Sequence, residues 1–188
     1  MRIILVHDGQ DEDNAAGILS GRRDQPLTEL GRAQIREAAE RIDEMDFSIE
    51  RILCSPLRRS RESAEIISKT ISGPSPEPED RLTARDLGVL TGHPFEDIPK
   101  YATTMLQTES IDCFLEAPQA ESLQFLNLRA KRLLQQLEES NPEDTMVLVT
   151  HGSMCSMIRA VWNKSGWYDA IMLGNLSSEV PMLLQRGQ

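Results

Sequence analysis

Three polar stretches of the chain hold residue types that could do chemistry. HDG begins at His7 and puts Asp8 directly after a histidine, and a neighbouring histidine and aspartate could act as an acid and base pair. HGS begins at His151, and SPLRRS begins at Ser55 and supplies arginines that could hold an anion. These stretches are the candidates for a functional site.

Each polar stretch follows a run of apolar residues that predicts a buried strand. The runs cover residues 3–6, 51–55 and 146–150 and are typical of parallel strands covered on both faces. Apolar residues at helical spacing lie between and after them, within 35–42, 57–71, 123–137 and 154–161. This order predicts an α/β fold, a three-layer α/β/α sandwich with a mostly parallel central sheet. Ligands bind beyond the carboxyl ends of such strands, where we expect the three polar stretches to meet.

The length of 188 residues suits one domain with a full core and slightly exceeds what an undecorated domain needs. We therefore expect a single domain over residues 1–188 with an insertion. The segment 81–120 has weak periodicity and is the candidate for that insertion. The stretch SGPSPEPED at 72–80 is rich in proline and acid, which predicts a surface loop.

Composition excludes several function classes. Hydrophobic residues make up 39% of the chain, and no apolar run approaches the roughly 20 residues that span a bilayer, so we expect no membrane partner and a cytoplasmic location. The formal net charge of −10 argues against nucleic-acid binding, which needs a positive face. The three scattered cysteines, Cys54, Cys113 and Cys155, have neither disulfide nor zinc spacing and are expected to be reduced packing residues.

Four ordered motifs resemble the histidine phosphatase superfamily, the phosphoglycerate-mutase-like group. LVHDGQDEDN aligns with the family pattern Leu-Val-Arg-His-Gly-Glu-Thr followed by Asn, and SGRRDQPLTELGRAQ is similar to the segment that follows it. CSPLRRSRESAEII resembles the Ser-Ser-Pro-Leu-x-Arg pattern, and VLVTHGSM resembles the second histidine motif. The resemblance covers nearly the whole chain and implies the phosphoglycerate-mutase-like fold.

The resemblance also implies a mechanism. In the family one histidine attacks phosphorus, arginines and a second histidine neutralise the phosphoryl oxygens, and a glutamate protonates the leaving oxygen. On this alignment the nucleophile position holds Asp8, the second histidine is His151, and the general-acid position in RLTARDLGVLTG holds Ala84. The positions that the resemblance assigns to phosphate binding are His7, which replaces an arginine, together with Asn14, Arg59 and Gly152.

These replacements change the expected activity. A carboxylate about 4 Å from a phosphate oxygen is repelled by several kcal/mol at an effective dielectric constant of about 20. We therefore expect Asp8 to weaken phosphate binding and to pair instead with Arg59 or His151, which would raise the pKa of His151. The resulting prediction is a catalytically impaired family member, or a pseudophosphatase, with a residual phosphate pocket.

Two other interpretations remain open at this stage. An active phosphomonoesterase could use Asp8 or His7 in place of the usual nucleophile, and Asp86, two residues beyond Ala84, is a possible substitute acid. A metal site could draw on the acidic run at residues 11–13 beside His7 and Asp8, but its spacing matches no calcium loop, so we expect no metal and no cofactor.

Mutase activity is not expected. The resemblance calls for a lysine at Phe95, a tyrosine at Leu87 and a pair of arginines in the insertion, of which Arg85 alone remains. The expected partners are a phosphorylated small molecule or phosphoprotein if the pocket works, and a protein partner or a second copy of the chain.

Overall fold

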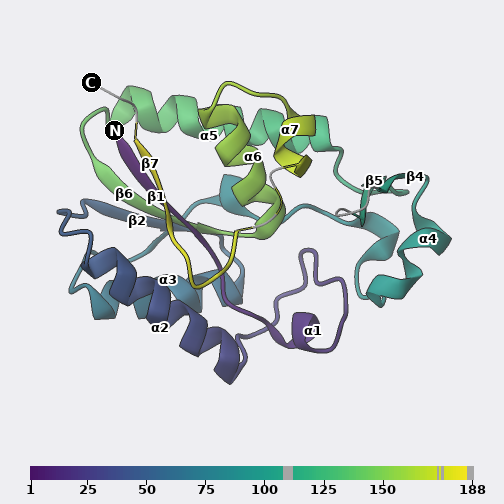
Figure 1. Cartoon of the computed structure of the whole chain (residues 1–188), viewed down its shortest axis with the longest axis horizontal. Helices are drawn as coiled ribbons and strands as arrows, with labels where there is room; N and C mark the ends of the chain where they lie inside the picture. Colours follow the sequence, from purple (N-terminus) through teal and green to yellow (C-terminus); the bar gives the residue numbers. More distant parts are fainter. Residues whose placement is uncertain (108–111, 173, 175, 186–188) are drawn as a thin grey trace.

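The computed structural model describes residues 1–107, 112–172, 174 and 176–185. Its centre is a five-stranded sheet in the order β3-β2-β6-β1-β7 (Figure 1). The strands are β1 (Arg2–His7), β2 (Arg51–Cys54), β3 (Glu77–Pro78), β6 (Thr145–Thr150) and β7 (Met182–Gln185). All neighbouring pairs run parallel except β1 and β7, which are antiparallel. The prediction of a mostly parallel sheet is confirmed.

Helices cover both faces of this sheet (Figure 1). Because side chains alternate along a strand, Ile4 and Val6 of β1 pack with α2 (Glu29–Asp43) and α3 (Arg58–Thr70). Ile3 and Leu5 face the opposite layer, where they pack with α5 (Leu123–Ser140) and α6 (Gly152–Trp162). The three-layer sandwich is therefore confirmed, and β1 is buried on both sides.

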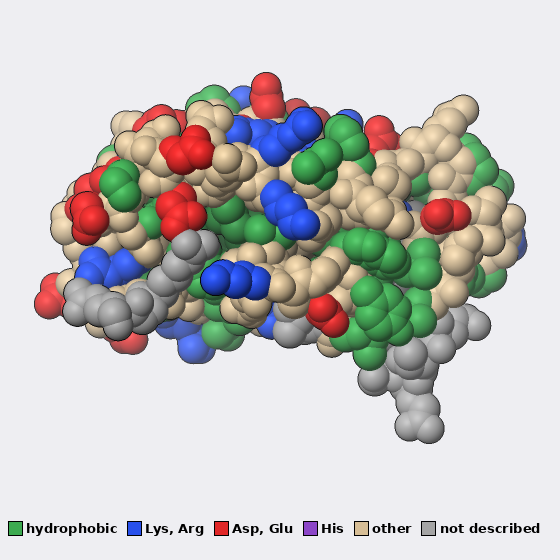
Figure 2. Space-filling model, turned by 90° about the horizontal axis from the view of Figure 1, so that it is seen from above, with side chains coloured by type: hydrophobic (Ala, Val, Ile, Leu, Met, Phe, Trp, Pro, Cys, Tyr) green, Lys and Arg blue, Asp and Glu red, His purple; other side chains and the backbone are tan. Residues whose placement is uncertain are grey.

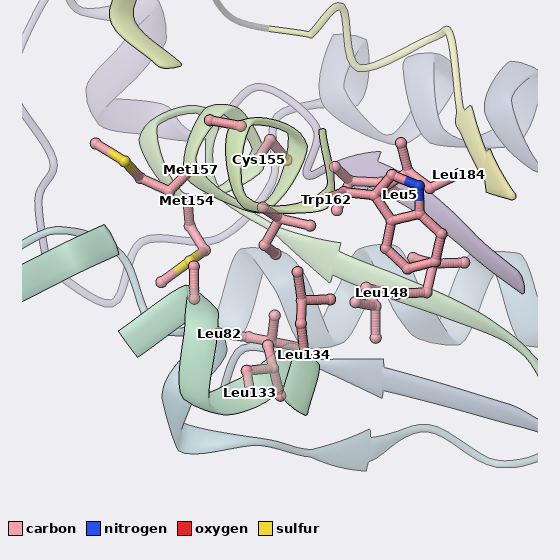
Figure 3. Packing of buried hydrophobic residues seen from close by; sticks show 14 of the residues in the cluster. Leu5, Leu82, Leu133, Leu134, Leu148, Met154, Cys155, Met157, Trp162 and Leu184 are labelled. Carbon is pink, nitrogen blue, oxygen red and sulfur yellow. The ribbon is translucent and has the colours of Figure 1, made fainter. Parts of the chain in front are cut away.

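Helix boundaries follow local capping chemistry. The hydroxyl of Thr28 accepts the backbone N–H of Gly31 at the start of α2, and Ser122 accepts that of Phe125 at the start of α5. The apolar stripes predicted within 35–42, 123–137 and 154–161 fall inside α2, α5 and α6, and the stripe at 57–71 extends by one residue beyond each end of α3. Figure 3 shows Met154 and Met157 among the buried side chains around α6, as their spacing predicts.

Two edge strands are not predicted from the sequence. The loop predicted at residues 72–80 contains β3, which pairs with the end of β2. This strand has two exposed residues, one of them Pro78, so it carries no apolar run. β7 alternates between exposed and buried residues and buries only Leu184, which is too weak a pattern to identify a strand.

The segment 81–120, our candidate insertion, contributes no strand to the main sheet among its described residues. A short 3-10 helix at 80–82 overlaps its start. Further 3-10 helices follow at 88–90 and 95–97, then α4 (Ile98–Tyr101) and the antiparallel pair β4 (Thr104–Gln107) and β5 (Asp112–Glu116). In Figure 1, α4 and the β4–β5 pair lie together at one end of the molecule. That the segment is an insertion stays a prediction.

The outer surface on the α5 side carries exposed apolar side chains. Phe125 and Leu128 lie on α5, and Tyr168 and Met172 lie on α7 (Trp167–Met172). Figure 2 shows this side, where hydrophobic side chains gather toward the end that holds the β4–β5 pair. No helix within the described ranges is long and apolar enough to cross a membrane.

Candidate functional site

The carboxyl ends of three neighbouring strands bring the predicted residues together. Asp8 follows β1, Ser55 follows β2 and His151 follows β6. The backbone N–H groups of Asp8 and Ser55 both donate to carbonyls of β6, which fixes these positions at the sheet edge. A cavity of about 400 Å³ opens there, and its lining includes His7, Asp8, Asn14, Arg59, Ala84, His151 and Gly152. The predicted meeting of the three polar stretches is confirmed.

Glycine at position 9 allows the chain to turn away after Asp8. A Cβ atom on Gly9 would overlap the backbone carbonyl of Gly31 in the first turn of α2. Only glycine fits this close approach, so the Gly9 of the HDG stretch positions Asp8 at the cavity floor by packing.

Three side chains contact one oxygen of the Asp8 carboxylate, and one of them donates a hydrogen bond to it. Its Oδ2 accepts the Ser60 hydroxyl at 2.8 Å and lies 3.1 Å from Nε of Arg59. His151 Nδ1 lies 2.9 Å from the same oxygen, as an ion-pair contact not aligned as a hydrogen bond. The side chain is only 4% exposed. The expectation that Asp8 pairs with Arg59 or His151 is met by both contacts.

These contacts keep Asp8 ionised. Burial on its own raises the pKa of the carboxyl, but the charges of His151, Arg59 and His7 and the interaction with His151 outweigh burial. The pKa of Asp8 therefore lies well below its ordinary value. The cavity floor carries a permanent negative charge at neutral pH.

His151 is engaged on both sides of its ring. Nε2 lies 2.8 Å from the Ser55 hydroxyl, and Nδ1 contacts Asp8. A neutral ring with its proton on Nδ1 suits both contacts, because Nε2 then accepts the Ser55 hydroxyl. The order carboxylate, imidazole, hydroxyl matches a serine hydrolase triad. Ser55 is 0% exposed and does not line the cavity, so it cannot attack a ligand there.

The prediction that Asp8 raises the pKa of His151 is wrong. Burial of the imidazole disfavours its charged form and is the largest influence, while the charge of Asp8 acts in the opposite direction. Arg59 and His7 add to the lowering, and the pKa falls below its ordinary value of 6.5. Burial therefore favours the neutral form of the His151 ring, against the opposing charge of Asp8.

Arg59 occupies the cavity floor, where its place after Ser-Pro-Leu predicts it. All three of its nitrogens have partners: Nη1 donates to the carbonyl of Arg23 at 2.8 Å, Nη2 donates to the carbonyl of Gly21 at 2.9 Å, and Nε lies between two carboxylates. The neighbouring Arg58 and Arg61 are exposed on α3, as expected. All nitrogens of the guanidinium thus already bind groups of the protein itself.

The second carboxylate beside Arg59 is Asp11, which sequence reasoning did not single out from the acidic run. Asp11 is fully buried, and its Oδ2 lies 3.4 Å from Arg59 Nε. Its Oδ1 accepts the backbone N–H of Asn14 at 2.6 Å and thereby caps the short helix α1 (Glu12–Ala15). The sequence pattern that could have singled it out is an aspartate at the N-cap position, directly before Glu-Asp-Asn. Two carboxylates therefore flank one guanidinium.

Three further predicted positions line the cavity. His7 is 25% exposed, with Nδ1 at 2.8 Å from the carbonyl of Leu176 and Nε2 at 3.6 Å from Asp8 Oδ1. Asn14 donates from its amide to Ser20. Gly152 begins α6 and lines the cavity there. Their assignment to phosphate binding stays a prediction.

Ala84 lines the cavity, and the loop that carries it is firmly held. The carbonyl of Ala84 accepts Nε of Arg22 at 3.1 Å and Nη2 of Arg129 at 3.3 Å. Both arginines also pair with the buried carboxylate of Glu121. The position expected to hold a proton donor thus lies in the cavity lining but carries no side-chain proton to donate.

The structure does not support Asp86 as a substitute acid. Its side chain is 42% exposed and is not part of the cavity lining. One carboxylate oxygen accepts the backbone N–H of Gly88 at 2.9 Å, and the other lies 3.6 Å from Arg22. The Asp86 carboxylate faces the backbone and solvent. Residues two positions apart in an irregular loop need not point the same way, so Asp86 does not share the position of Ala84 in the cavity lining.

The metal interpretation also lacks support. Glu12 is exposed, and Asp13 pairs with Arg23 at 2.7 Å. Within the described ranges, no group of three or more histidine, cysteine or acidic side chains has the geometry to hold a metal ion.

The outer wall of the cavity is apolar. Leu19, Leu87 and Phe95 line it, and Phe95 is 48% exposed. Leu87 and Phe95 are the positions where the resemblance expects a tyrosine and a lysine. The cavity therefore has apolar side chains at these two positions.

Comparison with known proteins agrees with the motifs. The family model "Histidine phosphatase superfamily (branch 1)" matches residues 3–177. The chain is 30% identical over 151 residues to "Uncharacterized phosphatase PhoE" of Bacillus subtilis, covering 80% of this chain and 72% of that protein. It is 31% identical over 156 residues to "Probable phosphoglycerate mutase GpmB" of Photorhabdus laumondii, covering 81% and 70%.

A solved structure supports the fold. A mycobacterial glucosyl-3-phosphoglycerate phosphatase superposes with a TM-score of 0.80 at 24% sequence identity and covers 97% of this chain and 91% of its own. At this identity the likeness extends to the fold alone.

Proposed function

The chain belongs to the histidine phosphatase superfamily, branch 1, and we propose that it is a pseudophosphatase of the cytoplasm whose phosphate pocket is neutralised by Asp8. The observation that carries this proposal is the contact of Asp8 Oδ2 with both Arg59 and His151. In a phosphatase these cationic and donor groups would receive the phosphoryl oxygens. Here a carboxylate of the protein itself takes their place.

The charges at the cavity floor support the proposal. Asp8 and Asp11 flank Arg59, so these three side chains together carry one net negative charge, while a second guanidinium, that of Arg85, lines the same cavity. Burial lowers the pKa of His151 and so favours its neutral form. A phosphate dianion would therefore meet repulsion where its charge needs to be balanced.

The alternative, an active phosphomonoesterase, would use Asp8 as a nucleophile through an acyl phosphate or would use His7. Asp8 Oδ2 is already contacted by Ser60, Arg59 and His151, and a strongly lowered pKa makes a carboxylate a weak nucleophile. His7 Nδ1 is engaged with the carbonyl of Leu176, and Ala84 offers no proton to a leaving group. These contacts favour the pseudophosphatase.

Restoring the family residues tests the proposal. The triple variant Asp8→His, Ala84→Glu and His7→Arg should hydrolyse p-nitrophenyl phosphate, because the loop at Ala84 is already held in position by Arg22 and Arg129. Addition of His7→Arg to the other two changes should raise the rate further. The matched control carries Asp8→Ala in place of Asp8→His and should be inactive. A folded triple variant that neither binds phosphate nor turns over would contradict the assignment of these positions.

A partner remains part of the proposal. A pocket that keeps its shape without turnover suits recognition of a ligand or of another protein, including a second copy of this chain.

A further inference from the structure

The charged groups that line the cavity balance one another, and two imidazoles lie among them. The described lining residues include two guanidiniums and two carboxylates, those of Arg59, Arg85, Asp8 and Asp11. The imidazoles belong to His7 and His151. Histidine is the side chain whose charge ordinarily changes between about pH 8 and about pH 5. This balanced lining therefore gains net positive charge in that range when these rings take up protons.

The ring of His151 can accept an added proton without moving. Its Nδ1 lies 2.9 Å from Asp8 Oδ2, and its Nε2 lies 2.8 Å from the Ser55 hydroxyl. In the neutral ring with its proton on Nδ1, Nε2 accepts the Ser55 hydroxyl. In the charged ring Nε2 donates instead, and the Ser55 oxygen accepts. Both states of the ring therefore keep both contacts.

The charges that face His151 come from the end of β1 and from α3. Asp8 favours the charged ring, whereas burial, Arg59 and His7 disfavour it, so the pKa of His151 lies below its ordinary value. A dianion bound in the cavity adds negative charge beside the ring and raises that pKa. Binding of the anion and binding of the proton therefore favour each other.

The first turn of α6 supplies donors for an oxyanion beside this ring. Gly152 and Ser153 are the first residues of α6, and both line the cavity. The first N–H groups of a helix have no carbonyl acceptor within the helix and favour anions. His151 directly precedes them as the N-cap residue. An oxyanion at this helix end thus lies next to the group that takes up the proton.

We propose that the cavity is a pH-dependent oxyanion site, which binds a tetrahedral dianion together with a proton that His151 takes up from solvent. At neutral pH the charges of the lining balance and Asp8 opposes the anion. At acidic pH the imidazolium of His151 pairs with Asp8, and the lining attracts the anion. This inference rests on the proposed function, because it describes the regulation of the pocket that Asp8 neutralises.

Isothermal titration calorimetry with sodium sulfate at constant ionic strength tests the inference. Sulfate keeps both of its charges between about pH 5 and about pH 8, so a change in affinity reports a change in the protein. The wild-type protein should bind sulfate at least about tenfold more tightly at about pH 5.5 than at about pH 7.5. Titrations at about pH 6.5 in buffers of different ionisation enthalpy should show proton uptake on binding.

Histidine variants locate the proton. The double variant His7→Gln, His151→Gln should lose the pH dependence of sulfate binding, and thermal denaturation shows whether it is folded. His7→Gln alone, at a partly exposed position, should keep the proton uptake that His151 provides. His93→Gln is the matched control, because His93 is the third histidine of the chain and is not part of the cavity lining. It should behave like the wild type.

The outcomes separate this inference from the proposed function. The inference would be overturned, and the pseudophosphatase proposal left intact, by absence of sulfate binding at every pH, by binding without proton uptake, or by equal pH dependence in the wild type and the folded double variant. Loss of all proton uptake in His7→Gln would overturn the role of His151. Sulfate binding by the wild type at about pH 7.5 that is as tight as binding by Asp8→Asn would instead overturn the claim that Asp8 neutralises the pocket, and with it the proposed function.

Discussion

Replacing Asp8 by asparagine should convert the cavity into a better phosphate site. The substitution keeps the size and shape of the side chain and removes its charge. Arg59 then retains Asp11 at 3.4 Å as its remaining carboxylate partner. The group of Asp8, Asp11 and Arg59 then changes from one net negative charge to none. Phosphate meets an Arg59 guanidinium whose charge is balanced by one carboxylate, that of Asp11.

The expected gain follows from the distances at the floor. One unit charge about 4 Å from another contributes about 4 kcal/mol at an effective dielectric constant of about 20. Water in the cavity and relaxation of Arg59 reduce this value, and we expect about 1.5 to 3 kcal/mol to remain. That gain corresponds to phosphate binding about tenfold to a hundredfold tighter than in the wild-type protein.

Titration with inorganic phosphate at low ionic strength measures this change, because salt screens the interaction. Asp13→Asn is the control for loss of a buried, arginine-paired carboxylate elsewhere, and it should bind phosphate like the wild type. Thermal denaturation confirms that each variant is folded. Equal phosphate affinity in the wild type and in a folded Asp8→Asn variant would refute the claim that Asp8 opposes phosphate.

The remaining predictions concern titration and thiol chemistry. The fold lowers the pKa of Asp8, so the ionised carboxylate stabilises the folded protein at pH values above its ordinary pKa of 3.8. This stabilisation is lost as the pH falls below 3.8. The difference in Tm between wild type and Asp8→Asn should therefore narrow on acidification from about pH 5 to about pH 3. The pKa of His151 is also lowered, so acidification below about 6.5 should destabilise the wild type, and thermal scans of His151→Gln should show a flatter dependence there. Burial raises the pKa of Cys54 to about 11 and that of Cys155 well above its ordinary value. A thiol reagent at about pH 8 should therefore not label the native Cys113→Ser variant, in which these are the two remaining cysteines. Rapid labelling would contradict the burial of both thiols.

The sheet and the meeting of its strand ends could be predicted because both depend on patterns that are local in sequence. Continuous apolar runs identified β1, β2 and β6, and parallel strands place their carboxyl ends at one edge. The fixed Ser-Pro-Leu spacing placed Arg59 in the cavity and its neighbours outside. Edge strands were missed because β3 and β7 bury too little side-chain surface to produce such a pattern.

The electrostatics of the site could not be predicted from the motifs. An Asp8 partner was expected to raise the pKa of His151, but the ring is so deeply buried that loss of water outweighs the neighbouring charge. The sequence presents Asp11 as one of several acidic residues of a solvated run, whereas the structure buries it beside Arg59. Asp86 was close to Ala84 in sequence, but a loop residue two positions away faces another direction. Burial and direction depend on contacts between distant segments, which a motif does not record.

The central claim is that Asp8 occupies the catalytic position without performing catalysis. The most direct test is hydrolysis of p-nitrophenyl phosphate by the wild-type protein and by Asp8→Ala between about pH 4 and about pH 8, with and without Mg²⁺. We predict no turnover by the wild type above that of Asp8→Ala at any pH. Wild-type turnover that disappears in a folded Asp8→Ala variant would contradict it and would identify Asp8 as a working nucleophile.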